Sequence, residues 1–265
     1  MIAVKLGGSI ITDRSRPRSV NYRAIRRLGS EIAEAQKALK GTCFVLANGS
    51  GSFGHKIEVE HKISDGFSDT RGRLWACRSR HEATIINQII VGELLKLGVA
   101  ATSLSPSAIM TTTEGTVAGS YWDTLGVILQ LGIVPVIHGD EVWDMKSGCV
   151  VFSSETCLRM AVEYLKENGW KVPFVIQCTD VDGVFKGGDE KILLPEITKT
   201  SFERVAKQVG GSRYIDSTGG MAHKVRESLM LAEQGIPSFI INGKKRRRVL
   251  RSILLRKPVI GTVIH

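Results

Sequence analysis

The order of apolar strands, glycine-bearing loops and amphipathic helices constrains the fold of this chain most. Residues 2–6 predict a buried strand, which two consecutive glycines follow. Apolar side chains at helical spacing run over 22–39, and Gly41 ends this helix before a second apolar strand at 43–47. Strand, loop, helix and strand in this order are typical of parallel strands joined by crossover helices. The sequence therefore predicts an α/β fold with a parallel sheet.

The same alternation continues along the rest of the chain. Apolar runs predict further strands at 99–104, 133–137, 174–177, 238–241 and 259–264. Helical stripes predict helices at 83–97, 124–130, 154–165 and 200–209, and another after residue 220. No linker, repeat or low-complexity stretch divides the two halves, so we expect a single domain over 1–265.

Three stretches are less regular. Residues 56–80 form a polar segment, and 141–151 form a polar, hairpin-like piece. The basic run 244–248 could attract nucleic acid or another acidic surface. The apolar side chains behind it favour instead the solvated start of a helix, and they are Val249, Ile253 and Leu254.

A glycine-rich loop at 49–55 directly follows the second strand. Its glycines let the backbone turn sharply and approach a ligand with no Cβ in the way. Exposed N–H groups in such a loop form a concave anion site, and His55 adds a side chain that can be charged near neutral pH. Taken alone, the loop is explained equally well as a Gly/Ser turn with an incidental histidine. Two further glycine loops, 7–8 and 219–220, favour the anion site.

Loops at the carboxyl ends of parallel strands gather along one crevice, so three glycine loops suit two phosphate-bearing ligands that face each other. Lys5, Arg14 and Lys224 lie in or beside these loops, where cations could stabilise a phosphoryl group in transfer. A lysine at the end of a buried strand must reach water or an anion, whereas Arg14 could equally be an ordinary exposed arginine. No Walker sequence is present, and the Gly-x-Gly-x-x-Gly spacing at 49–54 follows the second strand, which argues against a dinucleotide fold.

The charge balance also points to an anionic ligand. The net charge is +10, and the aromatic content is only 6%. No basic stretch is interleaved with aromatic side chains, so we expect no nucleic acid partner. No apolar run approaches membrane-spanning length, so we expect no membrane partner. The five cysteines are scattered without a Cys-x-x-Cys pair, which indicates reduced core thiols and a cytoplasmic protein.

Five motifs occur in a fixed order along the chain. They are Lys5-Leu6-Gly7-Gly8-Ser9, the loop 49–55, His138-Gly139-Asp140, the stretch 179–185, and Thr218-Gly219-Gly220-Met221 with Lys224. Together they resemble the amino-acid kinase superfamily over essentially the whole chain. The Gly-Ser-Phe-Gly-His sequence within 49–55 is similar to the isopentenyl phosphate kinases of that superfamily. The resemblance implies a three-layer αβα sandwich with a central, mainly parallel sheet, assembled as a homodimer. It also implies an acceptor bound by the N-terminal part and ATP with Mg²⁺ bound by the C-terminal part.

The resemblance also implies the site residues. The catalytic residues would be Lys5, Arg14, His55, Glu155 and Lys224. The nucleotide would contact Gly7, Gly8, Ser9, Thr179, Asp180, Gly183, Gly219 and Gly220. The acceptor would contact Ser50, Gly51, Gly54, His55 and Gly139. No side chain is expected to ligate a metal directly. The sequence departs from the family pattern at Arg14, Asn48, Ser50 and Glu155, where a lysine, a histidine, a glycine and an aspartate are usual.

A phosphate acceptor is also favoured on chemical grounds. A phosphomonoester has its second pKa near ~6, so it is a dianionic nucleophile at neutral pH and needs charge neutralisation rather than a general base. The expected activity is ATP-dependent phosphorylation of isopentenyl phosphate to its diphosphate. Another small phosphate or phosphonate, as in fosfomycin-type kinases, and a non-catalytic nucleotide-binding protein are the alternatives. Apolar side chains within 66–90 could hold a prenyl tail, although core packing explains most of them, and they include Phe67, Trp75 and Ile86.

Overall fold

A central eight-stranded sheet organises the molecule, whose computed structural model describes residues 1–13, 15–186, 192–202 and 220–265. Its strands are β1 (Ile2–Leu6), β2 (Phe44–Asn48), β3 (Ala101–Leu104), β6 (Val134–His138), β9 (Val175–Thr179), β12 (Glu196–Ile197), β13 (Ser238–Asn242) and β14 (Gly261–Ile264). They lie in the order β12-β14-β13-β9-β1-β2-β6-β3. Every neighbouring pair is parallel except β13 with β14. The mainly parallel sheet predicted from the sequence is confirmed.

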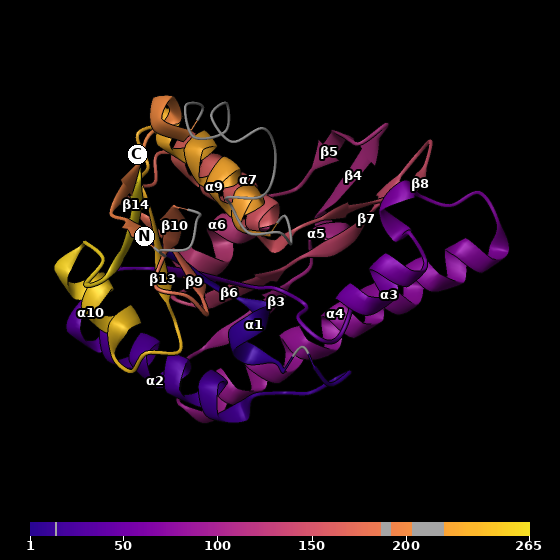
Figure 1. The fold of residues 1–265 in the computed structure, drawn as a ribbon. Helices are drawn as coiled ribbons and strands as arrows, with labels where there is room; N and C mark the ends of the chain where they lie inside the picture. The colour runs from indigo at the N-terminus through magenta and orange to yellow at the C-terminus, as the bar shows by residue number, and fades with distance from the viewer. Residues whose placement is uncertain (14, 187–191, 203–219) are drawn as a thin grey trace.

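Helices cover both faces of this sheet (Figure 1). One face carries α1 (Gly8–Ile11), α2 (Tyr22–Ala38), α4 (Thr70–Lys96) and α10 (Arg248–Leu255). The other carries α6 (Asp123–Gln130), α7 (Ser154–Glu167) and α9 (Gly220–Glu233). Each face has its own apolar core, and the three-layer αβα sandwich is therefore confirmed.

Two smaller sheets lie beside the central one. The larger has the strand order β5-β4-β7-β8, with β4 (Met110–Thr113), β5 (Thr116–Ser120), β7 (Asp140–Asp144) and β8 (Gly148–Phe152). Three short helices are near it, α3 (His55–Glu60), the 3₁₀ helix η1 (Ile63–Asp65) and α5 (Pro106–Ile109). The other sheet pairs β10 (Val184–Lys186) with β11 (Ile192–Leu194). Figure 1 shows β4, β5, β7, β8 and α3 at the end of the molecule away from α10.

The alternation of side chains along β1 places Lys5 on the α7 face. Val4 and Leu6 pack into the core beneath α2, whereas Ala3 packs into the core beneath α7. Lys5 shares the face of Ala3, because successive side chains of a strand point to opposite faces. By the same rule Asn48, which pairs with Leu6 across the sheet, points toward α4.

Several sequence-based boundaries differ from the structure. The polar segment predicted at 56–80 contains α3, η1 and the first turns of α4. The α4 helix begins at Thr70 because the Asp69 side chain caps it by accepting from the Gly72 backbone N–H at 2.6 Å. The hairpin of β4 and β5 was not predicted, whereas the hairpin-like piece at 141–151 corresponds to β7 and β8. Of the helix predicted at 200–209, residues 203–209 lie outside the described residues.

The basic run behaves as a surface segment that precedes a helix. The α10 helix begins at Arg248, and its buried side includes Val249, Leu250 and Ile253, while Leu254 is exposed. Arg247 pairs with Glu34 of α2 at 2.9 Å, and Arg248 pairs with Asp182. The apolar side of the helix was therefore predicted correctly except at Leu254.

The structure bears on two further expectations. None of the helices in the described ranges is long and apolar enough to cross a membrane. All five cysteines are free thiols. Cys149, Cys157 and Cys178 are buried, but Cys77 is exposed and Cys43 is half-buried, so only three of the five are core thiols.

Candidate active site

A buried carboxylate holds two lysines from opposite ends of the chain. Glu155 Oε1 lies 2.7 Å from Lys5 Nζ and 2.9 Å from Lys224 Nζ. Glu155 is in the first turn of α7, Lys5 in β1 and Lys224 in α9. The other carboxylate oxygen of Glu155 accepts from the Ser154 hydroxyl at 3.0 Å. Two ammonium groups and one carboxylate leave an excess positive charge at this point, which suits an anionic ligand.

The ionisation of this cluster follows from its burial and its charges. Burial opposes ionisation of Glu155, but the charges of Lys5 and Lys224 and their hydrogen bonds lower the pKa of this carboxyl well below its usual value. Burial lowers the pKa of Lys5, an effect that the Glu155 charge opposes and the Lys224 charge reinforces. Glu155 therefore remains a carboxylate at neutral pH.

Two glycine loops approach each other beside this cluster. Gly51 has φ = 57°, in the left-handed region, and a Cβ built there would lie 2.2 Å from Thr12 Oγ1. A Cβ on Gly8 would lie 2.7 Å from the Gly51 backbone. Only glycine allows this backbone conformation and this contact without strain. This close approach brings together the backbones of two glycine loops, whose N–H groups are the kind of donor that an anion site uses.

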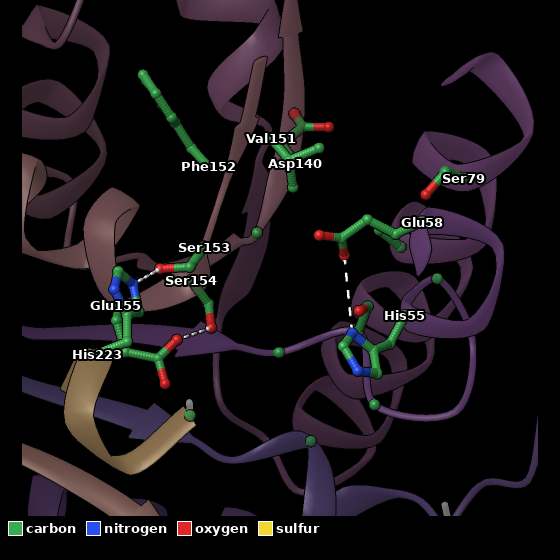
Figure 2. A pocket seen from close by; sticks show the side chains of 18 of the residues that line it. His55, Glu58, Ser79, Asp140, Val151, Phe152, Ser153, Ser154, Glu155 and His223 are labelled. Atoms are coloured by element: carbon green, nitrogen blue, oxygen red, sulfur yellow. Dashed lines mark hydrogen bonds and ion pairs between the residues drawn. The ribbon is translucent and has the colours of Figure 1, made fainter. Parts of the chain in front are cut away.

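A cavity of about 280 Å³ opens between the glycine loops, α3, α4, β7, β8 and α9. Figure 2 shows His55 at one side of it and Glu155 and His223 at the other. His55 begins α3, its side chain is 62% exposed, and its Nδ1 lies 3.8 Å from Glu58 Oε2. The predicted site residues that line this cavity are Lys5, Gly8, Ser50, Gly51, Gly54, His55, Gly139, Glu155, Gly220 and Lys224. Residues from opposite ends of the sequence thus converge on one cavity.

A second hollow, of about 410 Å³, contains two more of the predicted residues. Ser9 donates its hydroxyl to Asp180 Oδ1 at 3.0 Å, and Lys244 Nζ lies 3.6 Å from Asp180 Oδ2. Burial opposes ionisation of Asp180, but the Ser9 hydroxyl and the Lys244 charge lower the pKa of its carboxyl. Gly8 lines the first cavity and Ser9 the second, so the two hollows are adjacent along the chain.

Three described residues of the predicted set, Gly7, Thr179 and Gly183, line neither hollow. Gly7 and Thr179 are at strand ends, and a Cβ on Gly183 would lie 2.6 Å from Thr262 Oγ1, which explains this glycine by packing against β14. Arg14 and Gly219 lie outside the described residues.

Asn48, one of the departures from the family pattern, is a core residue. It is fully buried, and its Oδ1 accepts from Asn87 Nδ2 of α4 at 2.9 Å. Asn87 also donates to the Val136 carbonyl at 3.0 Å. Asn48 therefore joins the sheet to α4 and does not line the cavity, whereas Ser50 does line it.

The side chains of 66–90 suggested for a prenyl tail mostly have packing roles. Ile86 is fully buried in the core between the sheet and α4, and the Trp75 ring stacks on His61 with centroids 3.5 Å apart. Of the residues in 66–90, Ala83 contributes an apolar side chain to the cavity wall, and Val151 and Phe152 of β8 contribute the others. Core packing, the alternative named for these residues, is thus observed for Ile86.

Seven polar residues of the cavity were not predicted as site residues, namely Glu58, Ser79, Asp140, Glu141, Ser153, Ser154 and His223. Ser153 Oγ lies 2.7 Å from His223 Nε2, a contact drawn in Figure 2. Position along the chain offers a signal for some of them. Glu58 is one helical turn after His55, Glu141 follows the Gly139 motif, and His223 directly precedes Lys224. In the described ranges no group of three or more His, Cys, Asp and Glu side chains could hold a metal ion.

Comparison with known proteins identifies relatives of this chain. The model of the amino acid kinase family matches residues 1–242. The chain is 30% identical over 261 residues to an isopentenyl phosphate kinase of Methanocaldococcus jannaschii, covering 95% of this chain and 94% of that protein. It is also 30% identical over 277 aligned residues to an isopentenyl phosphate kinase of Methanothermobacter thermautotrophicus, covering 100% and 98%.

A solved structure agrees with these relatives. One described as an X-ray structure of isopentenyl phosphate kinase superposes with a TM-score of 0.82 at 28% identity, covering 100% of both chains. The arrangement of strands and helices is therefore shared along the whole length.

Proposed function

The chain belongs to the amino acid kinase family, and on this premise we propose that it transfers the terminal phosphoryl group of ATP to isopentenyl phosphate, which gives the diphosphate. The observation that carries the proposal is the Lys5–Glu155–Lys224 cluster, which faces the same cavity as His55 and the glycine loops. The relatives named isopentenyl phosphate kinase support the choice of acceptor.

The cluster supplies what a transfer between two anions needs. An oxygen of the acceptor phosphate forms the new P–O bond, and the bond from the terminal phosphorus to the bridging oxygen breaks, with that oxygen leaving on ADP. Lys5 and Lys224 are placed to neutralise the charge that develops on the transferred group. Glu155 holds the side-chain nitrogens of both lysines in position through its Oε1 atom, while the acceptor dianion requires no base.

The two halves of the chain would divide the substrates between them. We assign the acceptor phosphate to Ser50, Gly51, Gly54, His55 and Gly139, which line the cavity beside the apolar Val151. The nucleotide phosphates would extend from Gly8 and Gly220 toward the second hollow at Ser9 and Asp180. Mg²⁺ would neutralise phosphate charge and enter with ATP, held mainly by the phosphates and water, since the described side chains offer no cluster of ligands.

An acceptor panel tests the function. With ATP alone, with isopentenyl phosphate and with fosfomycin, ADP release should depend on isopentenyl phosphate. Lys5→Ala should lower kcat by about 10²-fold, as the loss of a comparable electrostatic donor does. Lys56→Ala, a change in an exposed lysine of α3 that is not part of the cavity lining, is the matched control.

The outcomes separate the alternatives. Turnover that depends on fosfomycin instead of isopentenyl phosphate would identify a kinase whose acceptor is a phosphonate. ATP binding without turnover on any acceptor would identify a non-catalytic nucleotide-binding protein. Unchanged kcat in Lys5→Ala would remove this lysine from the mechanism.

A further inference from the structure

A buried carboxyl group lies in the wall of the acceptor cavity, away from the lysine cluster. Glu141 is the second residue of β7, is only 4% exposed, and lines the same cavity as His55. Its neighbour across the hairpin is Val151 of β8, which also lines the cavity. Glu141 therefore borders the part of the cavity where the chain of an alkyl phosphate would lie if its phosphate contacted the loop at 49–55.

The carboxyl group of Glu141 has an unused hydrogen-bonding atom. Among the described residues, Oε2 has no hydrogen-bond partner. Arg80 of α4 pairs with Asp140 at 3.5 Å and donates to Ser107 Oγ at 2.7 Å, and no described cation pairs with Glu141. A buried polar atom without a partner costs about 1–3 kcal/mol. A hydrocarbon chain beside Oε2 would leave that cost in place.

The surroundings of Glu141 favour its neutral form. Burial raises the pKa of Glu141 to about 7, the Ser79 hydroxyl of α4 partly opposes this rise, and the charges of Asp140 and Glu58 add to it. Cys149 of β8 is close enough to Glu141 for their charges to interact. Burial and the Glu141 charge raise the pKa of the Cys149 thiol to about 11, so the thiol stays protonated near neutral pH. Glu141 thus exchanges a proton near neutral pH, and it can donate when protonated and accept when ionised.

We propose that Glu141 is a specificity-determining residue, which recognises a hydroxyl group on the chain of an alkyl monophosphate acceptor. A hydroxyl group matches both forms of the carboxyl, since it accepts from the acid and donates to the carboxylate. A hydrocarbon matches neither form. The inference rests on the proposed function, because it places the acceptor phosphate against the glycine loop. It adds hydroxylated alkyl phosphates to the acceptors of this cavity.

Two acceptors with the same carbon skeleton test the proposal. Isopentenyl phosphate and 3-hydroxy-3-methylbutyl phosphate differ by the addition of water across the double bond. The quantity measured is the ratio of kcat/KM for the hydroxylated acceptor to kcat/KM for isopentenyl phosphate. In Glu141→Val this ratio should fall about tenfold or more, mainly through KM for the hydroxylated acceptor, since one hydrogen bond to a buried group is lost. Glu141→Gln, which keeps a donor and an acceptor, should retain part of the ratio.

An exposed carboxyl outside the cavity provides the control. Glu60→Gln changes an exposed residue of α3 that is not part of the cavity lining, and it should leave the ratio within about twofold. An equal change of kcat/KM for both acceptors in Glu141→Val would overturn the proposal, because the loss of a purely structural residue would affect both acceptors alike. An effect of Glu60→Gln as large as that of Glu141→Val would overturn the proposal as well.

Two further measurements keep the proposal independent of folding and of turnover. If Glu141→Val does not fold, the pH dependence of Glu141→Gln decides. The wild-type ratio should rise as the pH passes through about 7, because the ionised carboxyl disfavours the hydrocarbon, and Glu141→Gln should abolish this rise. Ionisation of the acceptor phosphate affects both acceptors alike and therefore cancels in the ratio.

If the wild type phosphorylates neither acceptor, the proposed function fails, and calorimetric titration of both acceptors then measures the preference for the hydroxyl group without turnover. Equal affinities of wild type and Glu141→Val for the hydroxylated acceptor would overturn the proposed role of Glu141.

Discussion

Among single residues, two carboxyl groups in one cavity have pKa values shifted in opposite directions because their neighbours differ. Glu155 lies between two ammonium groups, and the pKa of its carboxyl is held well below its usual value. Glu141 is equally buried but has no cation beside it, and its pKa rises to about 7. Burial penalises charge at both positions, so it is the presence or absence of a paired cation that decides the ionisation.

The first prediction concerns Glu155. Glu155→Gln removes the charge that holds Lys5 and Lys224, so kcat should fall and the free energy of unfolding at neutral pH should drop by about 3–5 kcal/mol. Since the folded pKa is depressed, the carboxylate stabilises the fold above the usual glutamate pKa of 4.5 and loses this contribution as the pH falls. The deficit of Glu155→Gln, measured by urea unfolding, should therefore shrink below about pH 4.5. Glu60→Gln, an exposed position in α3, is the control, and an equal deficit at pH 7 in both variants would contradict the prediction.

The second prediction concerns His55 as a donor to the acceptor phosphate. A protonated imidazole forms a charge-assisted hydrogen bond to a phosphate oxygen, so His55→Ala should weaken acceptor binding and slow transfer. ATP affinity should stay nearly unchanged, and His55→Gln, which keeps a neutral donor, should recover part of the loss. Isothermal titration with each substrate and steady-state kinetics measure these effects. His81→Ala, at an exposed position of α4, is the control, and parental acceptor affinity in His55→Ala would contradict the role.

The third prediction follows from the pKa of Glu141. The folded pKa is raised, so the folded protein binds more protons than the unfolded chain between about pH 4.5 and 7, and stability falls as the pH rises through this range. Glu141→Gln removes the titration. The free energy of unfolding of Glu141→Gln minus that of wild type should therefore be roughly 2–3 kcal/mol larger at pH 8 than at pH 5. Unfolding by urea at both values measures the difference, and a difference that is independent of pH would refute the shift.

Among the helices, strands and loops, contacts between loops shape the proposed phosphate site more than helix or strand propensity does. The loop that carries Gly51 touches α1 at its first residue, Gly8, and at Thr12, which directly follows its last residue. Ser52 N donates to Thr12 Oγ1 at 3.0 Å, which fixes the loop further. The site therefore depends on the fit between two segments about 40 residues apart in sequence.

The fourth prediction tests this fit. In Gly51→Ala the new Cβ meets Thr12 Oγ1 at 2.2 Å, in a left-handed conformation, so the loop must shift. We expect a loss of acceptor affinity and a destabilisation of about 1–3 kcal/mol. Gly98→Ala, also at positive φ but with no heavy atom within 4 Å of its Cβ, should show only the backbone strain. Acceptor titration and thermal unfolding of both variants separate the two effects, and identical behaviour would rule out the loop contact.

At the scale of the whole molecule, the fifth prediction concerns assembly. The homodimer implied by the family resemblance predicts a mass in solution of twice the 29.0 kDa of one chain. Light scattering on the purified protein measures this mass directly. A single-chain mass across a range of protein concentrations would contradict the prediction.

Local sequence patterns were sufficient to predict most strands of the central sheet, several of the helices that cover it and the side chains that share a face, but not the short elements beside the sheet, such as α3 and the β4–β5 hairpin. Periods of two and of 3.6 residues are local properties, so they can be counted without knowledge of the rest of the chain. They placed the two main glycine loops at strand ends and Lys5 at the end of β1, all of which the structure confirms. The motif order identified the family, and Glu155 was expected from its position in that pattern.

How distant side chains meet depends on the packing of the whole chain and could not be read from local patterns. Glu155 is 150 residues from Lys5, and no local pattern states that one oxygen atom of Glu155 contacts both Lys5 and Lys224. Glu141 looks like an ordinary strand carboxylate until α3 and α4 bury it, and Asn48 looks like a loop residue until Asn87 binds it. Desolvation and pairing depend on the neighbours that packing supplies, and these determine both the charge of a group and its chemistry.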